Sequence, residues 1–531
     1  MRKKGGLRRK RGTRRLAAAL LSLVLFALAG CAPKALPEAS APAEAAGAAL
    51  TVCLGEDLGP LDPQLALDTG ELALSRLLYE GLMRPDGAGG WTCGAAESYR
   101  LSEDGRTCTL TLRRDALWSD GVPVTAQDFV YAWERLLAPE SASPYALDAA
   151  LWIEGGEASL YGEEGAALGV RALDDKTLEV RLAARCPYLD ALLALPALAP
   201  RRSEADALYN GPYCLEAAEA DVLRLRRSPT YWDRESVLPE EIAVRAYASG
   251  EEAVRALRAG ELDLSLFYPA EALPALQEEG FARLSPEDCV LYLDLNAAAP
   301  PLDDPLVRQA LALALDADAL LAAADLPGAR AADSLYPPGI GGAEAGAAAM
   351  PSGDRAAQAR AALAEAGYPG GEGFPELELL ALPEDVESGL AEALCTQWRE
   401  VLGVRVHAAE RDAADAAQAR MDGAFSLAIG SFFNAYGDAQ ALWDMDLRLA
   451  GLARESEALA QALDDLAGAR SESARRAALR RADEVLTQEA RCVPLCATQR
   501  AWLCRPEWEG VALTPSGDLL LCRARRADAQ E

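Results

Sequence analysis

Side chains that could catalyse a reaction are few in this sequence. His407 is the only histidine, so a histidine-based triad has one possible centre, and zinc motifs of the H-E-x-x-H kind are excluded. His407 ends a strand-like stretch that begins at Leu402, where a structural role is the more frequent one. Residues 87–90 are rich in glycine but lead into Trp91 as a turn, not as a phosphate-binding loop. We therefore predict a protein that is not an enzyme and that uses no cofactor.

Cysteine is the other residue type that could hold a metal ion. Three of the twelve cysteines lie close together, at positions 492, 496 and 504, but their spacing forms no compact C-x-x-C pair. We expect buried or disulfide-bonded cysteines and no metal site. Cys31 has a separate explanation, so eleven cysteines remain, and at least one thiol must stay free within a single chain.

The N-terminal residues have the layout of an export signal. A basic stretch at residues 2–15 precedes fourteen mostly apolar residues, which are too few to span a membrane comfortably. We assign residues 1–30 to a signal peptide. Residues 28–31, Leu-Ala-Gly-Cys, resemble the bacterial lipobox, and this resemblance implies that the Cys31 thiol receives a lipid. Residues 31–49 are rich in Ala, Pro and Glu, which predicts a flexible tether.

The charge of the chain argues against nucleic acid as a partner. After the first thirty residues the chain contains 43 basic and 82 acidic residues, a formal charge of −39. Such a surface repels phosphate groups, so we exclude a nucleic-acid role. No later segment has eighteen uninterrupted apolar residues. We expect an exported protein that the lipid on Cys31 anchors to the outer face of the cell membrane, or in the periplasm.

Strand and helix signals alternate along the rest of the chain. Apolar and polar residues alternate as in strands at residues 107–112, 177–182 and 222–225. Asp304 and Pro305 predict the start of a helix whose apolar spacing runs on to Leu320. A mixture of this kind predicts an α/β protein.

A second helix is indicated by the residues at its two ends, and two other segments show no clear pattern. Asp354 can cap a second helix, and Gly367 with Pro369 can stop it. Residues 329–352 and 411–419 are loop-like or weakly patterned, and either could flank a lobe.

Several separated motifs identify a family when they are taken together. They are Leu61-Asp62-Pro63, Tyr79-Glu80-Gly81-Leu82, the long run from Trp118 to Trp133, Asn210-Gly211-Pro212-Tyr213, Val307-Arg308-Gln309-Ala310-Leu311 and Ala364-Glu365-Ala366-Gly367-Tyr368-Pro369. In this combination the chain resembles the bacterial extracellular solute-binding proteins of family 5, the oligopeptide, dipeptide and nickel receptors of ABC importers. The resemblance extends from about residue 50 to residue 510.

The resemblance implies a two-lobed, periplasmic-binding-protein-like fold of the type II, large peptide-binding class, with an extra small domain in the first lobe. We expect the first lobe at residues 50–88, 205–288 and 498–531, its extra domain at 89–204, and the second lobe at 289–497. It also implies a monomer that encloses a peptide or peptide-like ligand between its lobes and delivers it to an ABC transporter permease.

The ligand site departs from the pattern of the family. The resemblance implies an aspartate, after a Gly-Trp pair in the second lobe, that meets the ammonium group of a peptide. In the stretch from Phe425 to Asp438 that position holds Ala435, and Phe432 stands at the tryptophan position. An unpaired buried ammonium is costly, so an unblocked peptide should bind poorly unless another acid compensates.

Candidate ligand-binding residues fall into two chemical groups. The polar candidates that could compensate are Asp438, Asn434 and Glu71. The aromatic candidates that could stack on a ligand, or equally form core, are Phe432, Phe433, Tyr436, Tyr145 and Tyr292.

Two alternative functions keep the same fold. A ligand-sensing or surface-interaction lipoprotein is the first of them, and the missing aspartate adds weight to it. Nickel binding is the second, but one histidine and no evident chelating motif argue against it.

The lipid anchor predicts the outcome of a single substitution. Cys31→Ser removes the thiol that would carry the lipid, so the protein should leave the cells and be found in the medium. Fractionation and immunoblotting of membranes and medium measure this, with Cys53→Ser as the matched control. Retention of the Cys31→Ser protein on the cells would contradict the anchor.

Overall fold

Residues 49–527 are described by a computed structural model, apart from residues 88, 164, 204–206, 325, 327, 344–353, 383–385, 434–435 and 448–455. The predicted signal peptide, Cys31 and nearly all of the predicted tether lie outside the described residues. Gly47 to Glu531 make up one unit in which the two lobes are in contact. No helix in the described ranges is long and apolar enough to cross a membrane.

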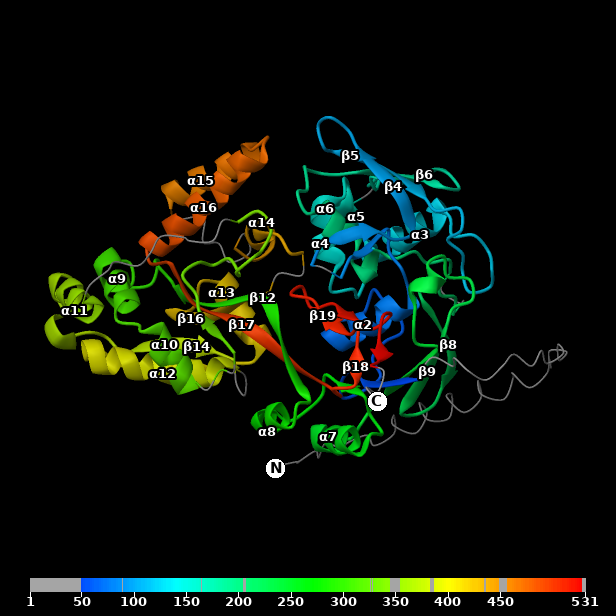
Figure 1. Cartoon of the computed structure of the whole chain (residues 1–531). Coiled ribbons are helices and arrows are strands. Elements are labelled where there is room, and N and C mark those ends of the chain that lie inside the picture. Colours follow the sequence, from blue (N-terminus) through cyan, green and yellow to red (C-terminus); the bar gives the residue numbers. More distant parts are fainter. Residues whose placement is uncertain are drawn as a thin grey trace, which may run out of the picture. The chain divides into compact units, whose positions relative to one another are not determined.

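A mixed sheet runs through both lobes (Figure 1). Among the described residues it contains eleven strands, ten of them in one continuous order. In that order they are β15 (Val406–Glu410), β14 (Leu377–Ala381), β16 (Leu427–Phe433), β12 (Ala282–Leu295), β17 (Cys492–Cys504), β11 (Leu264–Ser265), β1 (Leu50–Cys53), β10 (Glu241–Arg245), β9 (Val222–Arg227) and β8 (Tyr213–Ala218), while β13 (Arg330–Ala331) pairs with β17 outside the order.

The two longest strands, β12 and β17, connect the lobes. Residues 282–286 of β12 pair with residues 499–503 of β17 where β17 also pairs with β11 of the first lobe. Residues 290–294 of β12 pair with β17 and with β16 of the second lobe. The register shifts between Pro286 and Val290. The predicted lobe boundaries at 288/289 and 497/498 fall within these strands, and the domain division stays a prediction.

A second, four-stranded antiparallel sheet lies in the first lobe, within the range predicted as the extra domain. Its order is β4 (Ala96–Leu101), β5 (Thr107–Leu112), β7 (Thr177–Arg181) and β6 (Val170–Asp174). The alternation predicted for β5 is confirmed, because Cys108, Leu110 and Leu112 are buried while Thr111 between them is exposed. The strands predicted at 177–182 and 222–225 are also present, as β7 and β9.

Helices and short hairpins complete the first lobe. The helices are α2 (Thr69–Leu78), α3 (Ala126–Leu136), α4 (Ala146–Trp152), α5 (Gly156–Leu160), α6 (Leu189–Leu193), α7 (Gly250–Ala259) and α8 (Leu273–Glu278), with 3-10 turns η1 (Pro196–Leu198), η2 (Arg234–Ser236) and η3 (Ala270–Ala272). The hairpins pair β2 (Met83–Pro85) with β3 (Trp91–Cys93), β18 (Trp508–Glu509) with β21 (Arg525–Arg526), and β19 (Ala512–Leu513) with β20 (Leu519–Leu520).

The second lobe carries longer helices. They are α9 (Pro305–Leu313), α10 (Ala317–Ala324), α11 (Arg355–Glu365), α12 (Val386–Leu402), α13 (Ala413–Met421), α14 (Ala439–Ala441), α15 (Glu457–Gly468) and α16 (Glu472–Gln488), with the 3-10 turn η4 (Pro369–Gly371) and the π-helix η5 (Leu442–Leu447). In Figure 1 the orange pair α15 and α16 projects from the second lobe towards the side on which α4 to α6 of the first lobe lie.

Two of the predicted elements need correction, and the loop-like segment at 329–352 also contains the two-residue strand β13. The helix expected from Pro305 to Leu320 is two helices, because the chain leaves α9 at Ala314 and Asp316 then begins α10 by accepting from the Ala319 amide. The segment expected to be a loop at 411–419 contains α13. Asp412 caps this helix. Its alanines have high helix propensity but form no amphipathic stripe, so the sequence shows no period.

A buried polar group lies under the central strands of the second lobe. The Arg420 guanidinium donates to the Tyr292 hydroxyl at 2.8 Å and lies 3.3 Å from the Asp294 carboxylate. Burial raises the pKa of Asp294 to about 6, against the opposing effect of Arg420. Gly430 pairs with Tyr292 across β12 and β16. A Cβ at Gly430 would lie 2.5 Å from the Tyr292 ring, so the ring occupies the space that this glycine leaves.

This close approach predicts the effect of adding one methyl group. Gly430→Ala should lower the free energy of unfolding by roughly 1 to 3 kcal/mol, because the Tyr292 ring cannot move without losing Arg420. Denaturant unfolding of the lipid-free protein measures it. Gly468→Ala in α15 is the matched control, since nothing lies within 4 Å of its added Cβ. Equal stability of the two variants would contradict the packing.

Candidate functional site

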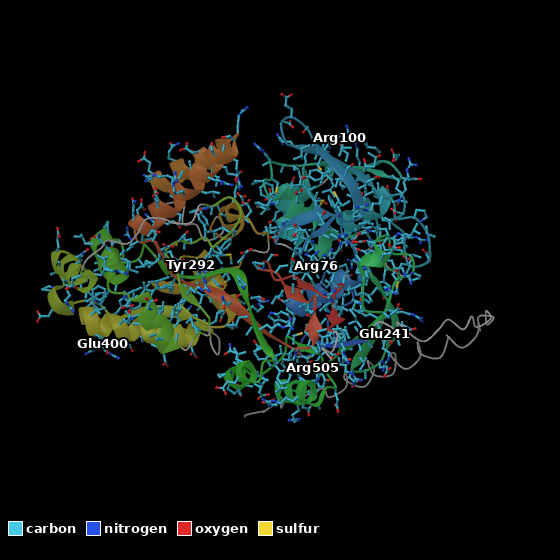
Figure 2. All side chains as sticks on the ribbon, viewed as in Figure 1. Arg76, Arg100, Glu241, Tyr292, Glu400 and Arg505 are labelled. Atoms are coloured by element: carbon cyan, nitrogen blue, oxygen red, sulfur yellow. The ribbon has the colours of Figure 1, made fainter. Side chains whose placement is uncertain are left out.

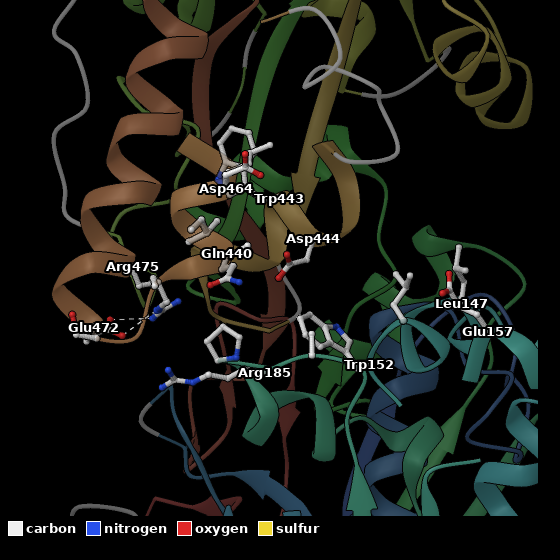
Figure 3. A pocket seen from close by; sticks show the side chains of 18 of the residues that line it. Leu147, Trp152, Glu157, Arg185, Gln440, Trp443, Asp444, Asp464, Glu472 and Arg475 are labelled. Carbon is white, nitrogen blue, oxygen red and sulfur yellow. Dashed lines mark hydrogen bonds and ion pairs between the residues drawn. The ribbon is translucent and has the colours of Figure 1, made fainter. Parts of the chain in front are cut away.

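A cavity of about 1100 Å³ lies between the first lobe and the second lobe (Figure 3). Its first-lobe wall comes from α4, α5 and residues 184–187, and its second-lobe wall from α14, η5, α15 and α16. Apolar and charged side chains are mixed on these walls, among them Leu147, Trp152, Trp443, Glu157, Arg185, Asp444, Asp464 and Arg475. In Figure 3, Leu147 and Trp152 lie on the opposite wall from Gln440 and Trp443. A ligand here would contact both lobes.

Asp438 helps to fix the second-lobe wall. It caps α14 by accepting from the Gln440 amide, and it accepts from Arg475 at 2.8 and 3.0 Å. Asp438 and Arg475 are 11% and 12% exposed, so water screens this ion pair little. The Asp438 carboxylate is therefore already neutralised within the second lobe.

Two tyrosines cross between the lobes beside the cavity. Tyr436 of the second lobe is buried against the core of the predicted extra domain, and its hydroxyl donates to Asp148 of α4 at 2.9 Å. In the opposite direction, the Tyr188 hydroxyl of the first lobe donates to Asp444 of η5 at 3.2 Å. The two rings are in contact, with centroids 5.1 Å apart. Each lobe thus provides one tyrosine and one aspartate.

Burial affects the titration of these groups. It raises the pKa of Asp148, and the hydrogen bond from Tyr436 opposes the rise. It also raises the pKa of Tyr145, at the start of α4, to about 12, to which the negative charge of Asp148 adds. The tyrosines are therefore neutral hydrogen-bond donors at neutral pH.

Glu71 has a structural role in this conformation. Its carboxylate accepts from the Leu67 amide at 2.5 Å and from the Asp68 amide at 3.4 Å, and Asp68 in turn accepts from the Glu71 amide. This capping box starts α2. Glu71 also lines a separate small cavity of about 220 Å³, and it is not among the residues that line the cavity between the lobes.

The other predicted residues are divided between core and site. Tyr292 and Phe432 are each 2% exposed and belong to the second-lobe core, so a ligand could reach them only after repacking. Tyr292 is labelled in Figure 2, on the second lobe. Phe433 is placed by its backbone alone, at the end of β16. Asn434, like Ala435, lies outside the described residues. Tyr145, half-buried at the start of α4, Tyr436 and Asp438 are not among the residues that line the cavity. Asp438 contacts the lining residue Arg475.

Sequence reasoning missed Asp148, Tyr188 and Asp444. Asp148 follows Tyr145 by three residues, so the candidate Tyr145 was a usable signal for it. Nothing in the sequence links Tyr188 or Asp444 to the site, since each is defined by a partner in the other lobe, 256 residues away.

The candidates for metal or catalytic chemistry do not assemble. His407 lies in β15 as predicted, half exposed, with carboxylate oxygens of Glu376 and Glu378 at 3.8 and 3.7 Å. Cys492, Cys496 and Cys504 are buried, unpaired thiols spread along β17. In the described ranges, no three His, Cys, Asp or Glu side chains are arranged to hold a metal ion.

Comparisons with known proteins agree with this geometry. Residues 92–451 match the family described as bacterial extracellular solute-binding proteins, family 5 middle. The periplasmic oligopeptide-binding protein OppA of Escherichia coli K12 is 30% identical over 480 residues, 86% of this chain and 88% of OppA. The probable deoxycholate-binding periplasmic protein YgiS of the same organism is 31% identical over 411 residues, 72% of this chain and 75% of YgiS.

A solved structure shows the same fold. The periplasmic murein tripeptide binding protein MppA, in its unliganded open form, matches with a TM-score of 0.79 at 25% identity, covering 91% of this chain and 99% of MppA. Two lobes around a cavity define a solute-binding protein. The chain belongs to the bacterial extracellular solute-binding proteins of family 5. The predicted fold class is confirmed, and so is a non-enzymatic function, because the family consists of binding proteins.

A buried acid beside the site predicts a dependence of stability on pH. Burial raises the pKa of Asp288, next to Gly437, to about 6, and the charge of Glu287 adds to the rise. The folded state then holds the proton more tightly than the unfolded state, so this residue lowers stability as pH rises from about 4 to about 6. Asp288→Asn removes the effect, and it should stabilise the protein by roughly 1 to 3 kcal/mol at pH 7.5 and little at pH 4.5.

Unfolding free energies of variant and wild type at the two pH values measure this difference. Asp104→Asn is the control of opposite sign, because the Ser102 hydroxyl lowers the pKa of that exposed acid. A gain for Asp288→Asn that is equal at both pH values would contradict the assignment.

Proposed function

We propose that this chain is a lipid-anchored extracellular receptor that captures a peptide or peptide-like ligand between its lobes and delivers it to the permease of an ABC importer. The observation that carries the proposal is the cavity with walls from both lobes, in a chain of family 5. Its volume of about 1100 Å³ is just above the usual range for small-molecule pockets, which suits a ligand larger than one amino acid.

Lobe closure is the step that links capture to delivery. A ligand that contacts both walls stabilises the conformation in which the walls are close, and a permease can recognise that conformation. Strands β12 and β17 are the continuous connections between the lobes, and the register shift in β12 supports bending there.

The names of the relatives and the chemistry of the cavity both bear on the class of ligand. OppA is named for oligopeptides, whereas YgiS is named for deoxycholate, so membership of the family does not fix the ligand. The cavity of this chain mixes indole rings with carboxylates and guanidinium groups, and it suits a peptide-like solute that has both apolar and charged parts.

Residues for this function follow from the geometry. Tyr436, Asp438 and Tyr145 remain our proposed ligand-site residues, because each lies next to or contacts groups at the junction of the lobes. Glu71, Tyr292 and Phe432 are proposed to support the site from positions already filled by protein contacts. The lipid on Cys31 would hold the receptor at the membrane where the permease lies.

Binding can be tested through one wall of the cavity. The protein from Ala32 onward would be purified, its copurified solute identified by mass spectrometry, and the solute returned to stripped protein in calorimetry and small-angle scattering. We expect heat of binding and a smaller radius of gyration. Ala467→Trp should weaken binding by at least about tenfold, since Ala467 is an exposed residue of the cavity wall.

Ala460→Trp is the matched control. It adds the same bulk to an exposed position of α15 that does not line the cavity. If neither the copurified solute nor a pool of peptides gave heat or compaction, the proposed function would be wrong.

A further inference from the structure

Asp148 lies at the junction of the lobes and, like Asp444, accepts from a tyrosine hydroxyl of the opposite lobe. Its hydrogen bond comes from the neutral hydroxyl of Tyr436. Within the part of the chain that the structure describes, no arginine or lysine forms an ion pair with it. By contrast, Asp438 is paired with Arg475 at 2.8 Å, and Asp518 with Arg76 at 2.5 Å.

A half-buried carboxylate without a cation is an unfavourable arrangement that a ligand could relieve. Desolvation penalises the charge of Asp148, and one hydroxyl donor offsets that penalty only in part. A positively charged group at the same oxygen would add a charge-assisted hydrogen bond, which is about twice as strong as a neutral one.

The rings around Asp148 suit a cation as well. The Tyr436 ring contacts the Tyr188 ring. The Tyr188 ring in turn packs in a T-shaped arrangement against Trp152, with ring centroids 5.3 Å apart. Tyr145 lies one helical turn before Asp148 and shares its electrostatic field. Aromatic faces attract ammonium and guanidinium groups, and the attraction grows when water is excluded.

Asp148 lies at the edge of the cavity between the lobes. Its neighbours on α4, Leu147 and Leu151, line the first-lobe wall, and Asp444 lines the facing wall (Figure 3). The Tyr436 hydroxyl is hydrogen-bonded to the Asp148 carboxylate. Tyr436 belongs to the segment that follows β16, so it can move with the second lobe.

We propose that Asp148 binds a positively charged group of the ligand, an ammonium or a guanidinium, which replaces the hydroxyl of Tyr436 at this carboxylate. The proposal rests on the proposed function and adds to it the charge of the ligand. When no ligand is bound, the Tyr436 hydroxyl occupies the position at the Asp148 carboxylate that the cationic group would take. Asp438 and Glu71 are held by Arg475 and by the capping box, whereas the hydrogen bond to Asp148 comes from a neutral hydroxyl that a cationic group could replace.

Three matched probes separate the charge of the ligand from its peptide character. They are trialanine amide, N-acetyl-trialanine amide and N-acetyl-Lys-Ala-Ala amide, titrated calorimetrically into stripped protein from Ala32 onward. We expect at least one of the two cationic probes to bind about tenfold or more tightly than the neutral one. Asp148→Asn keeps the shape and an acceptor for Tyr436, so the variant should fold, and it should reduce this ratio to near one.

Two further variants test the mechanism of replacement. Tyr436→Phe removes the competing hydroxyl and keeps the ring, so cationic probes should bind at least as tightly as to the wild type. Glu154→Gln is the matched control, an exposed acid two residues after α4 that faces Arg181 and does not line the cavity. It should leave the ratio of the wild type unchanged.

The possible outcomes distinguish this proposal from the proposed function. If the neutral and cationic probes bind equally well, or if folded Asp148→Asn keeps the preference, the role of Asp148 is overturned and peptide capture stands. If no peptide binds, peptide capture is overturned. In that case n-butylammonium is the probe: thermal stabilisation of the wild type but not of Asp148→Asn would support Asp148, and equal effects on both would overturn it.

Discussion

The pairing of β12 with β17 is the constraint on which the rest of the structure depends. These two strands share backbone hydrogen bonds from the first lobe to the second, so neither lobe can be displaced far without bending this ladder. One sheet therefore runs through both lobes, and β16, on the second-lobe half of β12, leads directly into the segment that contains Tyr436 and Asp438. The end of β16 therefore sets the position of the residues around the site.

Charge pairing explains how so acidic a chain folds. Several acids in poorly solvated positions are matched by arginine: Asp294 with Arg420, Asp438 with Arg475, and Asp62 with Arg135. Basic residues are almost all arginine, 47 against five lysines, and a guanidinium can serve two acceptors at once, as Arg420 does for Tyr292 and Asp294. Asp148 and Asp444, in the junction between the lobes, instead accept from tyrosine hydroxyls of the opposite lobe.

Local signals predicted much of the fold. Asp354 capped its helix as expected, and the Thr125–Asp128 motif forms a capping box at the start of α3. Alternation identified β5 because its buried residues face one core. The misses have physical causes as well. Helix α13 shows no period because alanine is compatible with either face, and the break between α9 and α10 is hidden by apolar residues on both sides of Asp316.

Motifs and composition determined what depends on nearby residues: the family, the absence of catalytic machinery, the α/β class and the starts of individual helices. Tertiary structure alone decided which candidate side chains are available. Tyr292 and Glu71 carry suitable chemistry, yet one is held beneath Gly430 and the other closes a capping box. Asp148 became a candidate only because of its hydrogen bond from Tyr436, which lies 288 residues later in the chain. The partners of a side chain, and the water they exclude, are set by contacts between distant segments, and the order of residues along the chain does not encode them in any local pattern.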